Sequence, residues 1–414
     1  MATNVPFKIT SSFIKQVPEE YSWLVHGLMN ILGYATLFIP GYLTFKYVRK
    51  INYISYGGDG WCFRSIQMCY GEEESGGASG NPPSVIQRST SQEIISILFH
   101  FFGLQVSYLT WGVLQEKVMT QKYQSGMETE HFKDSQFLVF VNRVLAFCMS
   151  GIYIFCTKQT RHRCPLYKYA FCSFSNIMSS WCQYEALKYV SFPHQVLAKA
   201  AKTIPVMLMG RIITKTKYEY YEYVTSVILS IGMLIFMLDV GNDRTDSAIT
   251  TFSGAILLIL YIIFDSFTSN WQQALFKTYK IKPVQMMCCV NLFSCIFTAV
   301  SLLQQNVFFK SFHFMLKYPQ FIVDCLLLSV CSAAGQLFIF STIAKFGPLI
   351  FAIITTIRQG LSVLLSCIIY NHHVTIAGTF GITLVFTSVL LRIYCGQRLK
   401  NLRKNLNTPQ KIAV

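Results

Sequence analysis

The feature that most constrains this chain is a succession of apolar runs, each about 20 residues long, between Ile94 and Tyr394. An α-helix needs a run of about that length to cross the hydrocarbon core of a bilayer. Charged residues make up only 13% of the 414 residues, whereas a soluble globular chain carries about 25%. The sequence therefore predicts an all-α polytopic membrane protein.

Ten transmembrane helices are predicted after residue 93, and their short connections favour antiparallel neighbours in one bundle. We place them at 94–115, 136–156, 165–187, 194–213, 221–239, 251–273, 285–304, 321–341, 348–369 and 374–394. An extra N-terminal hydrophobic helix is expected within 1–48. The stretch 49–92, rich in Gly, Ser, Pro and Glu, is expected to be a flexible polar linker.

Basic residues mark one side of the membrane. They gather in the connections 158–168 and 277–282 and in the basic tail 396–414, while acidic residues gather at 239–246. Because cytosolic loops carry an excess of Lys and Arg, the linker and the C-terminus are expected in the cytosol. Lysines within 310–317 go against this pattern. The loop clustering also accounts for the net charge of +16, so nucleic-acid binding is not expected.

An internal repeat is indicated by two similar helix starts. The segment Lys188–Pro193 opens the fourth predicted helix, and Lys345–Pro348 opens the ninth. The halves would be 93–240 and 241–395, each with five helices. Five is odd, so the two repeats would have inverted orientations, an arrangement typical of secondary transporters with a site near the membrane midplane.

Two lysines lie deep in the fourth predicted helix. Lys199 and Lys202 are three residues apart, which places both ammonium groups on one helical face, and Gln195 lies on the same stripe. Pro205 is expected to kink the helix just beyond them. Intramembrane cations normally face a bundle interior or a watery cavity, so the pair indicates an anion site. The alternative is that one or both lysines extend to the membrane interface.

A third cation lies in the ninth predicted helix. Arg358 is ten residues past Pro348, at nearly the same depth as the two lysines, and Thr355 shares its face. A guanidinium is a planar fork suited to phosphate or sulfate oxygens. The alternative is that Arg358 pairs with a buried acid such as Asp265 or Asp324.

Neutral and aromatic residues form a second group of candidates. Tyr108, Tyr184, Asn270 and Gln336 are predicted to contact the base or sugar of a ligand. Interhelical hydrogen bonding is the alternative for such polar positions. Arg143, inside the second predicted helix, fits either role.

Enzyme chemistry is not expected. The chain has no H-E-x-x-H, Walker loop or intramembrane Ser/His arrangement, and its 14 cysteines include no C-x-x-C pair. The sequence therefore predicts no cofactor and no metal site. Without a nucleotide-hydrolysing motif, transport would be driven by a gradient or by exchange.

Four segments carry a family resemblance. They are GLQVSYLTWGVLQEKVMT (103–120), PHQVLAKAAKTIPVMLMG (193–210), FDSFTSNWQQALFK (264–277) and AAGQLFIFSTIAKFGPLIFAIITTIRQGLSVLLS (333–366). They closely resemble Golgi transporters of 3′-phosphoadenosine 5′-phosphosulfate, PAPS, in the nucleotide-sugar transporter branch of solute carrier family 35, within the drug/metabolite transporter superfamily.

The resemblance implies ten helices in two inverted five-helix repeats that work by alternating access. It also implies that basic residues of the fourth and ninth helices hold the ligand's phosphates, and Lys199, Lys202 and Arg358 match those places. The ninth helix departs from some relatives, since it has a single Arg where they have Lys-Arg. The implied function is an antiporter that brings PAPS into the Golgi lumen for sulfation, in exchange for an adenosine monophosphate-type nucleotide.

The charge of the ligand agrees with this interpretation. PAPS carries about four negative charges, which three buried cations, with Arg143 as a fourth, suit better than they suit a doubly charged UDP-sugar. A nucleotide-sugar or other adenine-nucleotide transporter of the same fold is the first alternative, and a non-transporting receptor or scaffold is the second. The oligomeric state stays open, a homodimer included.

Overall fold

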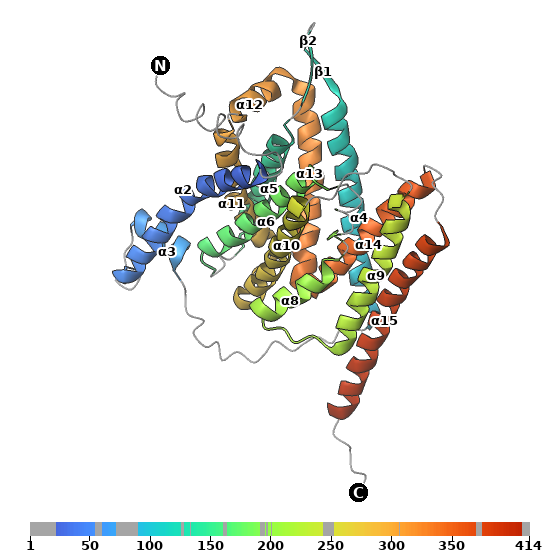
Figure 1. Cartoon of the computed structure of the whole chain (residues 1–414). Helices are drawn as coiled ribbons and strands as arrows, with labels where there is room; N and C mark the ends of the chain where they lie inside the picture. The colour runs from blue at the N-terminus through green and yellow to red at the C-terminus, as the bar shows by residue number, and fades with distance from the viewer. Residues whose placement is uncertain are drawn as a thin grey trace. The chain divides into compact units, whose positions relative to one another are not determined.

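The computed structural model describes residues 22–53, 60–71, 90–125, 128–132, 134–159, 164–190, 195, 198–199, 201–242, 252–305, 307–369 and 375–407. Most of them are helical (Figure 1). The elements are α2 Ser22–Lys50, α3 Trp61–Tyr70, α4 Thr90–Thr120, β1 Lys122–Ser125, β2 Glu128–His131, α5 Ser135–Cys156, α6 Tyr167–Ala186, α8 Thr203–Ile213, α9 Tyr220–Asn242, α10 Phe252–Tyr279, α11 Pro283–Gln304, α12 Phe308–Lys317, α13 Pro319–Phe346, α14 Pro348–Ile369 and α15 Ile376–Asn407.

Each of the ten predicted spans coincides with helical residues. Within the described part of the chain, seven helices are long and apolar enough to cross a membrane, namely α2, α4, α5, α10, α11, α13 and α15. The apolar stretches of α8, α9 and α14 are shorter, and α6 carries several polar residues. The all-α membrane class is therefore confirmed, while the count of ten spans stays a prediction.

Several short elements were not predicted from the sequence. Strands β1 and β2 form an antiparallel hairpin in which Lys122 lies opposite His131. Helix α12 lies in the connection between α11 and α13, and α3 lies inside the stretch expected to be a flexible linker. The predicted basic tail is also helical as far as Asn407, because its Leu, Lys and Arg residues are good helix formers.

Packing divides the chain into two compact units. Unit 1 comprises Met1–Met178 and Gln272–Lys345, and unit 2 comprises Ser179–Trp271 and Phe346–Val414. The division falls inside α6 and α10. Each unit therefore takes helices from both predicted five-helix halves.

In unit 1, α11 packs along α5 and also contacts α2 and α12. An aromatic cluster joins the hairpin, α12 and the start of α13 at one end of the unit, with Tyr123, Tyr318 and Phe321 at most 1% exposed. The ring of Tyr123 meets that of Phe321 edge-on, with the ring centroids 5.2 Å apart. The hairpin and α12 therefore each contribute aromatic side chains to the core of unit 1.

In unit 2, α9 and α15 pack side by side (Figure 1). Their backbones approach closely, because a Cβ at Gly232 would lie 2.9 Å from the carbonyl oxygen of Gly381, and one at Gly381 would lie 2.7 Å from the backbone nitrogen of Phe236. Further along, Arg392 Nη2 lies 2.9 Å from Glu222 Oε1. Two glycines and one ion pair therefore hold this helix pair together.

Candidate functional site

The fourth predicted helix is interrupted where its two lysines lie. Lys199 is helical, Ala201 and Lys202 form a turn, and α8 begins only at Thr203. Pro205 is consequently in the first turn of α8, where the missing N–H has no intrahelical partner to lose. The lysines therefore flank a break between helical segments, and the expectation of one continuous face with a kink is not met.

Lys202 is paired with an acid. Its side chain is 5% exposed, and its Nζ lies 3.4 Å from Asp265 Oδ2 on α10, whose side chain is 29% exposed. The same ammonium lies 5.5 Å from the ring centroid of Phe351 on α14. From the sequence, Asp265 is instead an alternative partner for Arg358. Burying an ammonium group without a counter-charge is costly, so the pair with Lys202 has a clear physical reason.

Lys199 and Arg358 belong to the same electrostatic group. The charged neighbours of Lys199 are Lys202, Arg358 and Asp265, and those of Tyr261 on α10 are Asp265 and Arg358. Among the described residues, no hydrogen bond or ion pair involves the Lys199 ammonium. We call Lys199, Lys202, Arg358 and Asp265 the cation cluster. Its three cations and one carboxylate leave a formal excess of two positive charges.

A sharp turn sets the start of α14 and hence the position of Arg358. Helix α13 ends at Phe346, Gly347 adopts a φ of 86°, and Pro348 begins α14. A left-handed residue after a helix favours Gly, and the first position of a helix tolerates Pro. Thr355 lies on this helix, and its hydroxyl donates to the carbonyl oxygen of Phe351 at 2.8 Å. The donor of Thr355 is therefore already used by the backbone.

Two other predicted ligand contacts stabilise the fold around the cluster. Gln195 is 1% exposed, and its Nε2 donates to the carbonyl oxygen of Gln183 at 2.6 Å. Asn270 is fully buried and donates to the carbonyl of Val206 at 3.0 Å, which joins α10 to α8. Tyr184, in contrast, is 53% exposed. A role for these three residues in ligand binding stays a prediction.

Unit 1 holds the remaining predicted residues in an amide network. Arg143 Nη1 of α5 donates to Asn291 Oδ1 at 3.4 Å, and Asn291 Nδ2 donates to Gln336 Oε1 of α13 at 2.8 Å. Tyr108 of α4 lies beside Gly335 of α13, since a Cβ at Gly335 would be 3.7 Å from its ring. Arg143 and Gln336 thus come together through Asn291, and we call these three residues the amide network.

Sequence reasoning missed Asn291, which is the hub of this network and is fully buried. A signal was present, since an isolated Asn in an apolar helix must find a hydrogen-bond partner to offset its desolvation. The cation cluster also contains two aromatic neighbours that the sequence analysis did not name, Phe351 and Tyr261. Aromatic residues are so common in this chain that nothing in the sequence separates these two from the others.

Asp324, the second acid considered for Arg358, belongs to a different pair. Its Oδ1 lies 3.0 Å from Lys117 Nζ, and its Oδ2 accepts a hydrogen bond from Tyr123 at 3.1 Å. Lys117 is 51% exposed on its side chain and Asp324 only 9%. This pair therefore fastens α4 and the hairpin to the start of α13 within unit 1.

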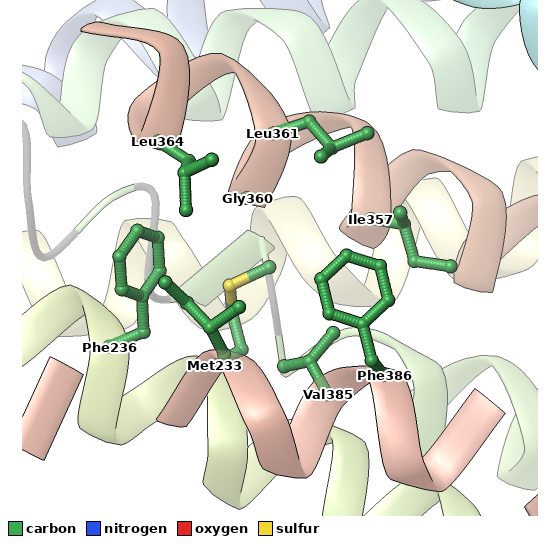
Figure 2. Close-up of a pocket in the computed structure, with 9 residues that line it drawn as sticks. Met233, Phe236, Ile357, Gly360, Leu361, Leu364, Val385 and Phe386 are labelled. Carbon is green, nitrogen blue, oxygen red and sulfur yellow. The ribbon is translucent and has the colours of Figure 1, made fainter. Parts of the chain in front are cut away.

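An apolar pocket lies on the other side of α14 (Figure 2). It encloses about 30 Å³ between α9, α14 and α15. The lining residues are Met233, Phe236, Ile357, Gly360, Leu361, Leu364, Ile382, Val385 and Phe386. At 3.6 residues per turn, Gly360 and Leu364 lie on the face of α14 away from Arg358, while Ile357 and Leu361 lie at its flanks. This pocket lacks the charged groups that an anion needs, so it is separate from the cation cluster.

The chemistry open to the cation cluster is the binding of an anion with several charges. Ammonium and guanidinium groups donate charge-assisted hydrogen bonds to phosphate and sulfate oxygens. No group of three or more His, Cys, Asp or Glu side chains in the described part of the chain is placed to hold a metal ion.

Comparisons with known proteins agree with the resemblance found in the sequence. A sequence model of the UAA transporter family matches residues 95–396. "Adenosine 3'-phospho 5'-phosphosulfate transporter 1" of Drosophila melanogaster is 49% identical over 98% of this chain and 90% of its own length. "UDP-galactose/UDP-glucose transporter 5" of Arabidopsis thaliana is 35% identical over 76% of this chain and 91% of its own.

One solved structure, titled only as a crystal structure of a protein, has the same fold. It superposes with a TM-score of 0.53 at 11% sequence identity, over 73% of this chain and 98% of that one. Identity this low carries information about the fold alone.

Proposed function

The chain belongs to the UAA transporter family, and from this premise we propose that it carries PAPS from the cytosol into the Golgi lumen in exchange for an adenosine monophosphate-type nucleotide. It is a membrane transporter and not an enzyme. The linker and the C-terminus are assigned to the cytosol, on the side that collects Lys and Arg. The imported PAPS would serve sulfation in the lumen.

The observation that carries this proposal is the excess positive charge of the cation cluster. Lys199, Lys202 and Arg358 lie around the carboxylate of Asp265, which is paired with Lys202. Cations left without full neutralisation inside a membrane protein are expensive unless a ligand completes them. The phosphate and sulfate groups of PAPS would more than offset this excess, and a protein named as a PAPS transporter is similar to 98% of this chain.

Alternating access is supported by how the helices pair within each unit. Helix α5 packs with α11, α8 with α14, and α9 with α15. Each pair joins a helix of the first predicted half to its counterpart five helices later. Two inverted repeats related by a pseudo-twofold axis would produce this pairing.

The charge balance favours exchange over net uptake. In the empty carrier the positive charge of the cluster faces a low dielectric during reorientation, whereas a bound anion offsets that charge. The loaded carrier therefore reorients more readily, and return with a smaller adenine nucleotide would complete the cycle.

A nucleotide sugar is the second candidate substrate. The observation in its favour is the 35% identity to a protein named as a UDP-galactose/UDP-glucose transporter. Such a ligand carries about two negative charges, because each phosphate of a diphosphate diester contributes one. Its charge equals the formal excess of two positive charges in the cluster, so the preference for PAPS rests on the 49% identity to a protein named as a PAPS transporter and not on charge.

Uptake by purified protein tests the proposal. Proteoliposomes loaded with adenosine monophosphate should accumulate sulfur-labelled PAPS in a saturable manner, and excess UDP-sugar should compete weakly. Efficient competition by UDP-sugars together with poor PAPS uptake would assign the chain to nucleotide-sugar transport. Failure to take up either ligand, in protein that is shown to be folded, would favour a non-transporting receptor or scaffold.

A further inference from the structure

Asp265 is the acidic member of the cation cluster, and its pairing is loose. The distance from Lys202 Nζ to Asp265 Oδ2 is 3.4 Å, whereas charge-assisted N–H···O bonds are typically about 2.7–2.9 Å. The lysine side chain is 5% exposed, but the aspartate side chain is 29% exposed. The carboxylate therefore keeps open space around it while the ammonium is enclosed.

A phosphate and this carboxylate would compete for the same ammonium. Lys202 is held between Asp265 and the ring of Phe351, so little of its surface remains for a second anion. Two anions beside each other in a low dielectric also repel strongly. An incoming phosphate or sulfate must therefore displace Asp265 before it can bind Lys202.

Lys199 differs from Lys202 in this respect. No described acceptor binds its ammonium, so an anion can bind Lys199 without first breaking an ion pair. The two lysines of the cluster are consequently not equivalent. Lys199 is available in the empty protein, and Lys202 becomes available only when Asp265 moves away.

We propose that Asp265 is the internal counter-ion of this transporter, bound to Lys202 in the empty site and displaced by a phosphate or sulfate group of the ligand. The inference rests on the proposed function only in taking the ligand to be a phosphate or sulfate ester. It makes Asp265 a positioning residue that weakens ligand binding. By lowering the positive excess from three charges to two, Asp265 also eases the return of the empty carrier.

The Asp265→Asn variant should therefore gain affinity and lose net transport. Removing the competitor should tighten binding of PAPS and of inorganic pyrophosphate by about fivefold, the size expected for one ion pair of moderate strength. The ratio of net uptake into empty proteoliposomes to exchange into loaded ones should fall. Asp324→Asn is the matched control, since it breaks a Lys–Asp pair outside the cluster and should leave both quantities unchanged.

Binding is measured on the purified full chain by isothermal titration, with the thermal unfolding temperature recorded for each variant. Equal or weaker anion binding by folded Asp265→Asn, with an unchanged transport ratio, would overturn the proposal. Should that variant unfold, Lys202→Gln is compared with the Lys202→Gln/Asp265→Asn double variant. The proposal requires the double variant to bind anions more tightly than Lys202→Gln alone, because the single change leaves an unpaired carboxylate in the site.

Measuring both PAPS and inorganic pyrophosphate distinguishes the role of Asp265 from the assignment of the substrate. Wild-type protein that binds pyrophosphate but not PAPS would reject the proposed substrate, while Asp265 is still judged by the pyrophosphate affinities. Wild-type protein that binds neither anion would reject both, because no phosphate would then be able to displace the carboxylate.

Discussion

The cation cluster of unit 2 and the amide network of unit 1 each hold buried basic groups, but they satisfy them differently. In the amide network, Arg143 donates a hydrogen bond to the neutral carboxamide of Asn291, and Asn291 donates one to Gln336. In the cation cluster, three basic groups lie around the carboxylate of Asp265, which is paired with Lys202. The first arrangement offers one cation to neutral acceptors, whereas the second groups three cations with one carboxylate.

This difference separates a folding role from a binding role. Buried donors and acceptors that satisfy one another rigidify the protein whether or not a ligand is present. Repulsion between cations raises the free energy of the empty protein. A bound anion offsets that repulsion and lowers the free energy again. Substitutions in the amide network should therefore act first on stability, and substitutions in the cation cluster should act first on transport.

The largest effect is expected for the cations themselves. Lys199→Gln and Arg358→Gln each remove a charge-assisted interaction with the ligand, so PAPS uptake should fall by about 10- to 100-fold. For Lys199→Gln the unfolding temperature should stay the same or rise, because a charge next to Lys202 and Arg358 is removed. Uptake by proteoliposomes and thermal unfolding in detergent measure the two quantities. A variant that retains more than half of wild-type uptake would place the anion site elsewhere, with Arg143 as the next candidate.

The next effect concerns the hub of the amide network. Asn291→Leu leaves the Arg143 guanidinium and the Gln336 carbonyl without their buried partner, so the free energy of unfolding should drop by about 2–3 kcal/mol. Asn291→Asp keeps an acceptor for Arg143 and should cost less. The unfolding temperatures of the two variants provide the measurement. Equal stability of Asn291→Leu and the wild type would show that the network does not support the fold.

A smaller loss of stability is expected at Asn270. Replacing it with Ala leaves the carbonyl of Val206 without its donor, which should cost about 1–2 kcal/mol. Uptake per folded molecule should change less than about threefold, since the amide bonds the backbone rather than the ligand. A large rise in KM for PAPS with normal stability would instead restore the predicted contact between Asn270 and the nucleotide.

The smallest effect is expected on the far side of α14. Gly360→Ala adds a methyl group whose nearest neighbour is the terminal carbon of Met233, 2.8 Å away. A thioether chain is flexible enough to move, and Ala favours the helix by about 1 kcal/mol. Uptake should therefore stay within about twofold of wild type. Loss of uptake comparable to that of Arg358→Gln would mean that both faces of α14 serve transport.

The grouping of the three cations could be predicted from the sequence. The depth of Lys199 and Lys202 after Pro193 matched that of Arg358 after Pro348, and the structure indeed groups them electrostatically. The pair between Lys202 and Asp265 could not be predicted, because it depends on how α10 is rotated against the break before α8. Hydropathy gives the length of each helix but not that rotation.

Polar residues in similar apolar helices could not be told apart. Asn270 and Gln336 were given the same role, yet one donates to a backbone carbonyl and the other accepts from a side chain. The hairpin and α12 were missed because they are too short for a membrane pattern. Their contribution comes from tertiary packing of Tyr123 and Phe314, which a single sequence does not reveal.

Helix α15 has a mechanical consequence. Its 32 residues from Ile376 to Asn407 form one rod, about 48 Å long at 1.5 Å per residue, of which the apolar part ends at Leu399. The ion pair between Arg392 and Glu222 attaches α15 to α9 near the middle of α15, so this point can act as a pivot. A tilt of about 10° around the midpoint would swing the last turn by about 4 Å. Any tilt of α15 during transport would thus displace its C-terminal segment beyond Leu399, outside the bilayer.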